Sequence, residues 1–162
     1  MRTINLIVVH SSATLPDPKY GVEWIRNIHV NEKGWDDIGY HYVIPPDGIV
    51  IPARSVYRAG AHAFGYNRNS IGICLIGGVD ENNKAVDNYT KHQKASLITL
   101  LKVLRLQWGR DIAICGHRDL SEDVDGDGII EQFEWMKECP CIDIPAFCRK
   151  HNIDPKWKLG SE

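Results

Sequence analysis

The chain has 162 residues, of which 43% are hydrophobic and 25% are charged, a balance that is ordinary for a soluble globular protein. Its 19 basic and 21 acidic residues give a net charge of -2, which excludes the strong positive field expected of a protein that binds nucleic acid or an anionic membrane. No apolar run is long enough to cross a bilayer. The length predicts a single monomeric domain over residues 1–162, with its core at 4–150.

The N-terminal residues lack the pattern of a secretory signal. MRTINLIVVHSS contains an apolar run of only six residues. We therefore expect synthesis in the cytoplasm, so that any target outside the cell is reached by another route. The five cysteines are an odd number and argue against a disulfide framework, and Cys74 and Cys115 lie in apolar runs typical of buried thiols.

The first half of the chain predicts a strand and a helix. Residues 4–9 (INLIVV) are rich in β-branched side chains and predict a buried strand, with His10 at its end. After a loop with two prolines, the apolar spacing in 22–34 predicts an amphipathic helix that ends at Gly34. Because the ends of central strands expose functional side chains, His10 is a candidate ligand.

A β-hairpin is predicted at 35–53, where Pro-Pro-Asp-Gly forms the turn. Period-two alternation places Tyr40, Tyr42 and Ile44 on one face of it and His41 and Val43 on the other. A tyrosine hydroxyl here could reach a reacting carbonyl, but the spacing alone does not choose between Tyr40 and Tyr42.

The rest of the chain predicts alternating strands and helices. Residues 58–70 form a loop of small and polar residues that bears His62 and Asn67. The remaining predicted elements are a central strand at 71–78, a helix at 90–109, a strand at 111–115 that leads to His117, a helix at 131–138, and a short C-terminal helix followed by a polar tail.

Metal-type ligands stand out in the stretch from Cys115 to Cys141. His117 and Cys139 are two such ligands, and catalytic zinc takes three protein ligands, so the third should be distant in sequence, with His10 as the candidate. In an extended segment Lys137 and Cys139 would face one pocket, where the ammonium could stabilise an oxyanion beside the metal. Cys141 would share that face and is a competing ligand.

Five motifs in order, VVHSSAT, GWDDIGYHYVI, GAHAFGYNRNSIGICLIGG, GHRDL and KECP, resemble the zinc-dependent N-acetylmuramoyl-L-alanine amidases of the phage lysozyme and peptidoglycan-recognition-protein type. The resemblance covers roughly residues 4 to 148. It implies an α/β fold in which a central mixed β-sheet is flanked by helices, with a zinc cleft at one side. It also implies hydrolysis of the amide between the muramic lactyl group and L-alanine.

The resemblance further implies a set of site residues. The zinc ligands would be His10, His117 and Cys139, the catalytic residues Tyr40 and Lys137, and the groove residues His62 and Asn67. The chain departs from the family pattern in two places: Cys141 replaces the glycine of Cys-Pro-Gly, and an acidic insertion separates His117 from Lys137.

That insertion, DVDGDGIIEQFE at 123–134, matches the twelve-residue EF-hand calcium loop. The pattern predicts that Ca²⁺ is held as a structural cofactor, although a solvated acidic loop is the alternative. HRDLSE is a poor first helix, so a paired EF-hand is not expected. The predicted calcium ligands are Asp123, Asp125, Asp127, the Ile129 carbonyl, Glu131 through water, and Glu134 as the bidentate carboxylate.

Four functions remain to be separated. The first is a lytic amidase of phage endolysin type, which acts on peptidoglycan after holin-mediated release. The second is a module that binds muropeptides without cleaving them, and the third is a cytoplasmic amidase that recycles soluble wall fragments. The fourth, a calcium-regulated interaction protein, leaves His10, His117 and Lys137 unexplained. The complete set of ligands and catalytic positions favours the enzyme.

Overall fold

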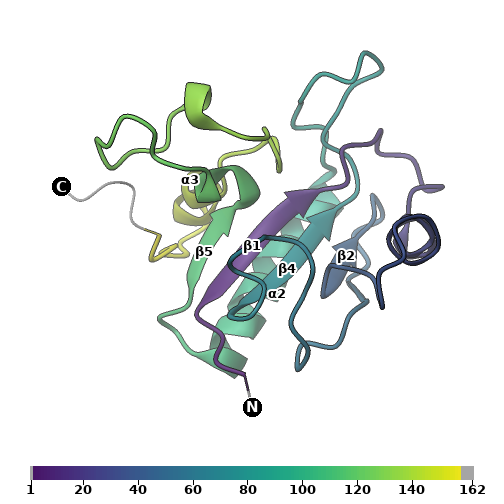
Figure 1. The fold of residues 1–162 in the computed structure, drawn as a ribbon, viewed down its shortest axis with the longest axis horizontal. Coiled ribbons are helices and arrows are strands. Elements are labelled where there is room, and N and C mark those ends of the chain that lie inside the picture. The colour runs from purple at the N-terminus through teal and green to yellow at the C-terminus, as the bar shows by residue number, and fades with distance from the viewer. Residues whose placement is uncertain (1, 158–162) are drawn as a thin grey trace.

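The computed structural model describes residues 2–157 and is built around one five-stranded sheet with the strand order β3-β2-β4-β1-β5 (Figure 1). Its strands are β1 (Leu6–Ser11), β2 (Tyr42–Ile44), β3 (Ile51–Pro52), β4 (Ser70–Leu75) and β5 (Ala113–Gly116). The β2–β3 hairpin is antiparallel and the other pairs are parallel. The predicted α/β fold with a mixed sheet is therefore confirmed, with β4 as its central strand.

The helices lie close to where the apolar spacing predicts them. They are α1 (Val22–Arg26), which continues as the π-helix η1 (Asn27–Glu32), α2 (Lys91–Trp108) and α3 (Ile144–Lys150), with short 3₁₀ turns η2 (His117–Leu120) and η3 (Gln132–Glu134). None of the described helices has the length and apolar character needed to cross a bilayer. Of the predicted polar tail, residues 158–162 lie outside the described part of the chain.

The prediction of a helix at 131–138 is wrong, because only the single turn η3 forms there. Trp135 has φ -64° and ψ 115°, an extended conformation that ends the turn. Its ring packs against the guanidinium of Arg118, 4.1 Å from the ring centroid. This contact with the segment after β5 holds Trp135 outside a helix.

The large core lies between the sheet and α2, which Figure 1 shows behind the sheet. The side chains of Ile7 and Val9 in β1 point into this core, together with Leu97, Leu100, Leu101 and Leu104 of α2. A capping box of Thr90 and Gln93 begins α2. Gln93 Nε2 also donates to the carbonyls of Ile44 and Ile76, at 2.9 and 2.8 Å, which fastens the start of α2 to the sheet. By strand alternation, His10 points to the opposite face.

The predicted alternation through the hairpin is wrong at Tyr40. Tyr42 packs against the large core, whereas Tyr40 packs with Val43 against a smaller cluster on the other side of the sheet. A bend at His41 precedes β2, because the main-chain N–H of His41 donates to the Gly72 carbonyl and its Nδ1 accepts from the Gly72 N–H, both at 2.9 Å. Tyr40 thereby lies beside His10, with 5.1 Å between ring centroids.

Candidate active site

The three residues predicted as zinc ligands come together from distant segments. His10 lies near the end of β1, and His117 follows β5, which is the parallel neighbour of β1. The two imidazoles therefore meet at the same end of the sheet, with ring centroids 4.6 Å apart. Cys139 joins them, and one ligand atom from each of the three residues lies within 4.8 Å of the others.

Four contacts hold Cys139 beside the histidines. The main-chain N–H of Arg118 donates to the Cys139 carbonyl at 2.8 Å, and the Tyr89 hydroxyl donates to the next carbonyl, that of Pro140, at 2.6 Å. The Pro140 ring packs so closely on Gly116 that a Cβ there would lie 2.6 Å from Pro140 Cδ. The Ser11 N–H donates to Cys139 Sγ at 3.2 Å, and such a bond stabilises a thiolate.

Cys141 is placed differently from Cys139. Its Sγ lies 4.0 Å from Ser11 Oγ. It belongs to none of the His, Cys and carboxylate groups that come close enough to share an ion among the described residues. Of the two cysteines, the structure therefore groups Cys139 with His10 and His117.

The chemistry of this group fits zinc. Burial lowers the pKa of His10 and of His117, aided in both by the nearby charge of Lys137, so the imidazoles are neutral and have a free lone pair. Burial raises the pKa of the Cys139 thiol, although the Ser11 N–H opposes that shift, so metal binding would displace a proton. Two imidazole nitrogens and one sulfur are three zinc-type ligands, the number that catalytic zinc sites use while a fourth position stays open.

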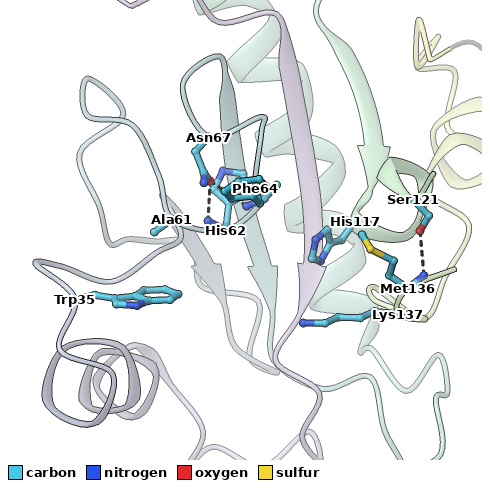
Figure 2. A pocket seen from close by; sticks show the side chains of 10 residues that line it. Trp35, Ala61, His62, Phe64, Asn67, His117, Ser121, Met136 and Lys137 are labelled. Carbon is cyan, nitrogen blue, oxygen red and sulfur yellow. Dashed lines mark hydrogen bonds between the residues drawn. The ribbon is translucent and has the colours of Figure 1, made fainter.

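A cleft of about 400 Å³ lies next to this group (Figure 2). Its polar lining includes His62, Asn67, His117 and Lys137, while Trp35, Phe64 and Met136 form its apolar walls. Figure 2 shows Trp35 and Lys137 reaching into the cleft from opposite sides. The apolar wall was not predicted from the sequence, although a phenylalanine among the small and polar residues of the 58–70 loop was a usable signal. In the structure Phe64 is 100% exposed.

Tyr40 and Asn67 have surroundings that limit what they can do. Burial, together with the thiols of Cys74 and Cys139, raises the pKa of Tyr40 well above its ordinary value, so its hydroxyl is a hydrogen-bond donor rather than a base. Asn67 Oδ1 accepts from the main-chain N–H groups of His62 and Ala63, at 2.8 and 2.9 Å (Figure 2). Asn67 therefore orders the loop that carries His62.

The acidic loop brings its carboxylates into two groups. One contains Asp123, Asp125 and Glu134, and the other Asp125, Asp127 and Glu131. Several of these oxygens already accept main-chain N–H groups of the loop: Glu134 Oε1 from Val124 at 2.6 Å, Glu134 Oε2 from Glu131 at 2.9 Å, and Asp123 from Gly126 at 2.7 Å. The carboxylates among the predicted ligands therefore form two groups that share Asp125.

Two histidines outside the site make the fold sensitive to acid. Burial lowers the pKa of His29 and that of His41 from 6.5 to about 4, so the folded chain excludes protons that the unfolded chain binds. The contribution of these two residues to the free energy of unfolding is therefore fully present above pH 6.5. It decreases as the pH falls toward 4, by about 1.4 kcal/mol per pH unit for each residue. Urea unfolding of the zinc-free protein between pH 7 and 4.5 should show this decline.

A matched pair of variants isolates one of these residues. The His29→Asn variant, in which the amide oxygen replaces Nδ1 as the acceptor of the Gly39 N–H, should lose part of the slope. Gln107→Asn changes an exposed side chain of α2 that does not titrate, and it should keep all of the slope. An unfolding free energy that stays constant between pH 6.5 and 4.5 would contradict the prediction.

Comparison with known proteins identifies relatives over nearly the whole chain. The family model described as N-acetylmuramoyl-L-alanine amidase matches residues 1–141. An endolysin of Enterobacteria phage T3 is 37% identical over 151 residues, which are 93% of this chain and 89% of that one. A protein of Haemophilus influenzae is 48% identical over 115 residues, 69% of this chain and 98% of that one. Among solved structures, the N-acetylmuramoyl-L-alanine amidase LysC from Clostridium intestinale has a TM-score of 0.69 and 28% identity, and covers 94% of this chain and 87% of its own.

Proposed function

This chain belongs to the N-acetylmuramoyl-L-alanine amidase family and is a peptidoglycan amidase, and we propose that it depends on zinc held by His10, His117 and Cys139. The observation that carries the proposal is the approach of their ligand atoms to within 4.8 Å, beside a cleft lined by Lys137. A zinc ion bound there would supply a Lewis acid for the amide carbonyl and activate water. The scissile bond is the amide between N-acetylmuramic acid and L-alanine.

The side chains around the site would stabilise the negative charge that develops on the carbonyl oxygen and would orient the substrate. Lys137 is exposed on the cleft wall, so its ammonium can approach the carbonyl oxygen as negative charge develops there. Tyr40, whose phenol stays protonated, can donate a hydrogen bond to the same group. The apolar side chains of Trp35, Phe64 and Met136 offer surfaces for the sugar and peptide parts of the substrate.

We assign the chain the role of an endolysin, made in the cytoplasm and active on the cell wall. Its match to the T3 phage endolysin over 93% of its length supports this role above recycling of soluble fragments and above binding without cleavage. The test is to add the zinc-loaded protein to purified sacculi and follow turbidity. We expect the turbidity of the sacculi to fall. A zinc chelator should stop this lytic activity, and added zinc should restore the activity. Sacculi that bind the protein and stay turbid would favour the binding module.

Calcium binding by residues 123–134 stays a prediction. The approach of Asp123, Asp125 and Glu134 supports it, and an ion there would stabilise the segment that leads to Lys137 and Cys139. If the loop binds Ca²⁺, a Ca²⁺ concentration about 100 times the dissociation constant should add about 2.7 kcal/mol to the free energy of unfolding. Thermal unfolding with and without Ca²⁺ measures this stabilisation. Glu134→Gln should remove the stabilisation by Ca²⁺, whereas Glu122→Gln, just outside the loop, should retain it. An unchanged wild-type melting temperature would reject calcium.

A further inference from the structure

A line of hydrogen bonds runs behind His10, away from Cys139. His10 Nε2 lies 3.0 Å from His62 Nδ1, and His62 Nε2 lies 3.3 Å from the hydroxyl oxygen of Ser70. Ser70 Oγ in turn lies 2.8 Å from the carbonyl oxygen of Tyr66. The line therefore connects β1, the 58–70 loop and the first residue of β4, and it ends on a main-chain carbonyl.

The terminal carbonyl decides the direction of every bond in this line. A carbonyl can only accept, so the single hydrogen of Ser70 is committed to Tyr66. The Ser70 oxygen must then accept from His62, which places the hydrogen of the neutral His62 ring on Nε2. His62 Nδ1 is left with a lone pair and accepts from His10 Nε2–H. It follows that His10 Nδ1 has a free lone pair.

That free nitrogen faces the metal-type ligands. His10 Nδ1 lies 3.9 Å from Cys139 Sγ. A histidine that binds a metal through one nitrogen usually donates the N–H of the other to a fixed acceptor, which sets its tautomer and the orientation of its ring. In this chain the acceptor is a second histidine, whose own tautomer is set by a serine.

A glycine in the central strand β4 leaves space for the ring of His62. Gly72 lies within β4, and a Cβ at this position would come within 2.6 Å of the His62 ring. Glycine is a poor residue for a strand interior and often marks a position that something else must approach closely. The His62 ring also meets His41 edge-on, with 5.7 Å between ring centroids. The surroundings of His62 therefore fix its ring next to His10, although the ring also borders the cleft.

We infer that Ser70 and His62 are positioning residues that hold His10 as its Nε2–H tautomer and so keep His10 Nδ1 available to the metal. The inference rests on the proposed zinc site. It gives His62 a role toward the ligand rather than only toward the substrate groove. Neither residue needs to touch the reacting amide.

The first test reads the tautomers directly, by long-range ¹H–¹⁵N correlation on the zinc-loaded full-length protein. We expect zinc on His10 Nδ1, a hydrogen on His10 Nε2, and a hydrogen on His62 Nε2. Zinc on His10 Nε2, or a hydrogen on His62 Nδ1, would overturn the inference whatever the activity of the protein.

The second test measures zinc affinity by competition with a chromophoric chelator. His62→Phe keeps a ring but has no acceptor, and it should weaken zinc binding by about 10- to 100-fold. Ser70→Ala should also weaken zinc binding. His62→Asn, whose Oδ1 lies at the same number of bonds from Cα as His62 Nδ1 and can accept from His10, should bind more tightly than His62→Phe. Ser96→Ala removes another serine-to-carbonyl bond, on α2, and should leave the affinity unchanged.

The outcomes separate this inference from the proposed function. If the wild type does not bind zinc, both fail. If the wild type binds zinc and cleaves peptidoglycan, but His62→Phe and Ser70→Ala bind zinc as tightly as it does, the inference alone fails.

Discussion

Replacing Cys139 with alanine should remove bound zinc and reduce amidase activity by more than about 100-fold. Loss of a residue that only hydrogen-bonds to a metal ligand already costs up to about 100-fold, and loss of the ligand itself should cost more. The reason is geometric, because Cys139 supplies the sulfur that lies with His10 and His117 within 4.8 Å. Zinc stoichiometry by atomic emission, together with hydrolysis of purified peptidoglycan, measures both effects.

Cys141→Ala is the matched control, because the two thiols are only two residues apart. Cys141 Sγ contacts Ser11 Oγ at 4.0 Å and lies outside the ligand group. This variant should keep its zinc and its activity. If Cys141→Ala lost zinc while Cys139→Ala retained it, the assignment of the thiolate would be wrong.

Lys137→Ala should separate catalysis from metal binding. The side chain lines the cleft but supplies no ligand atom, so the variant should bind zinc normally. If the ammonium stabilises the developing oxyanion, kcat should fall by roughly 100- to 1000-fold with little change in KM, the loss typical of removing one such group. Steady-state hydrolysis of a soluble muropeptide provides both constants.

Two further variants at lysine positions make this result specific. Lys137→Arg retains a cation and should recover part of the lost kcat. Lys102→Ala removes an exposed lysine from α2, on the other side of the sheet, and should behave as the wild type. A Lys137→Ala protein with normal kcat would remove Lys137 from the mechanism.

The positions of the two histidines proposed as zinc ligands, His10 and His117, followed from local patterns. INLIVV is followed directly by His10, and DIAIC is followed by Gly116 and then His117; neighbouring parallel strands bring such residues to one end of a sheet. The start of α2 was also readable, since Thr90 and Gln93 form a capping box. These features depend on residues close together in the chain, where periodicity and capping are informative.

The features that were missed depend on contacts between distant segments. The face of Tyr40 changed because His41 is bonded to Gly72 of β4, 31 residues away, and no alternation pattern includes that bond. The helix after the acidic loop was replaced by a turn because Trp135 packs on Arg118. The partnership of His62 with His10 spans 52 residues, and neither motif indicates it.

The most direct measurement of the central claim is the identity of the new chemical ends formed on peptidoglycan. Zinc-loaded wild-type protein is incubated with purified sacculi and with a soluble muropeptide, and new amino termini and new reducing sugars are quantified. We expect new L-alanine amino termini, no new reducing sugars, and no product after zinc is removed. Zinc-loaded protein that binds both substrates and releases no L-alanine termini from either would contradict this expectation, and would leave a binding module in place of an amidase.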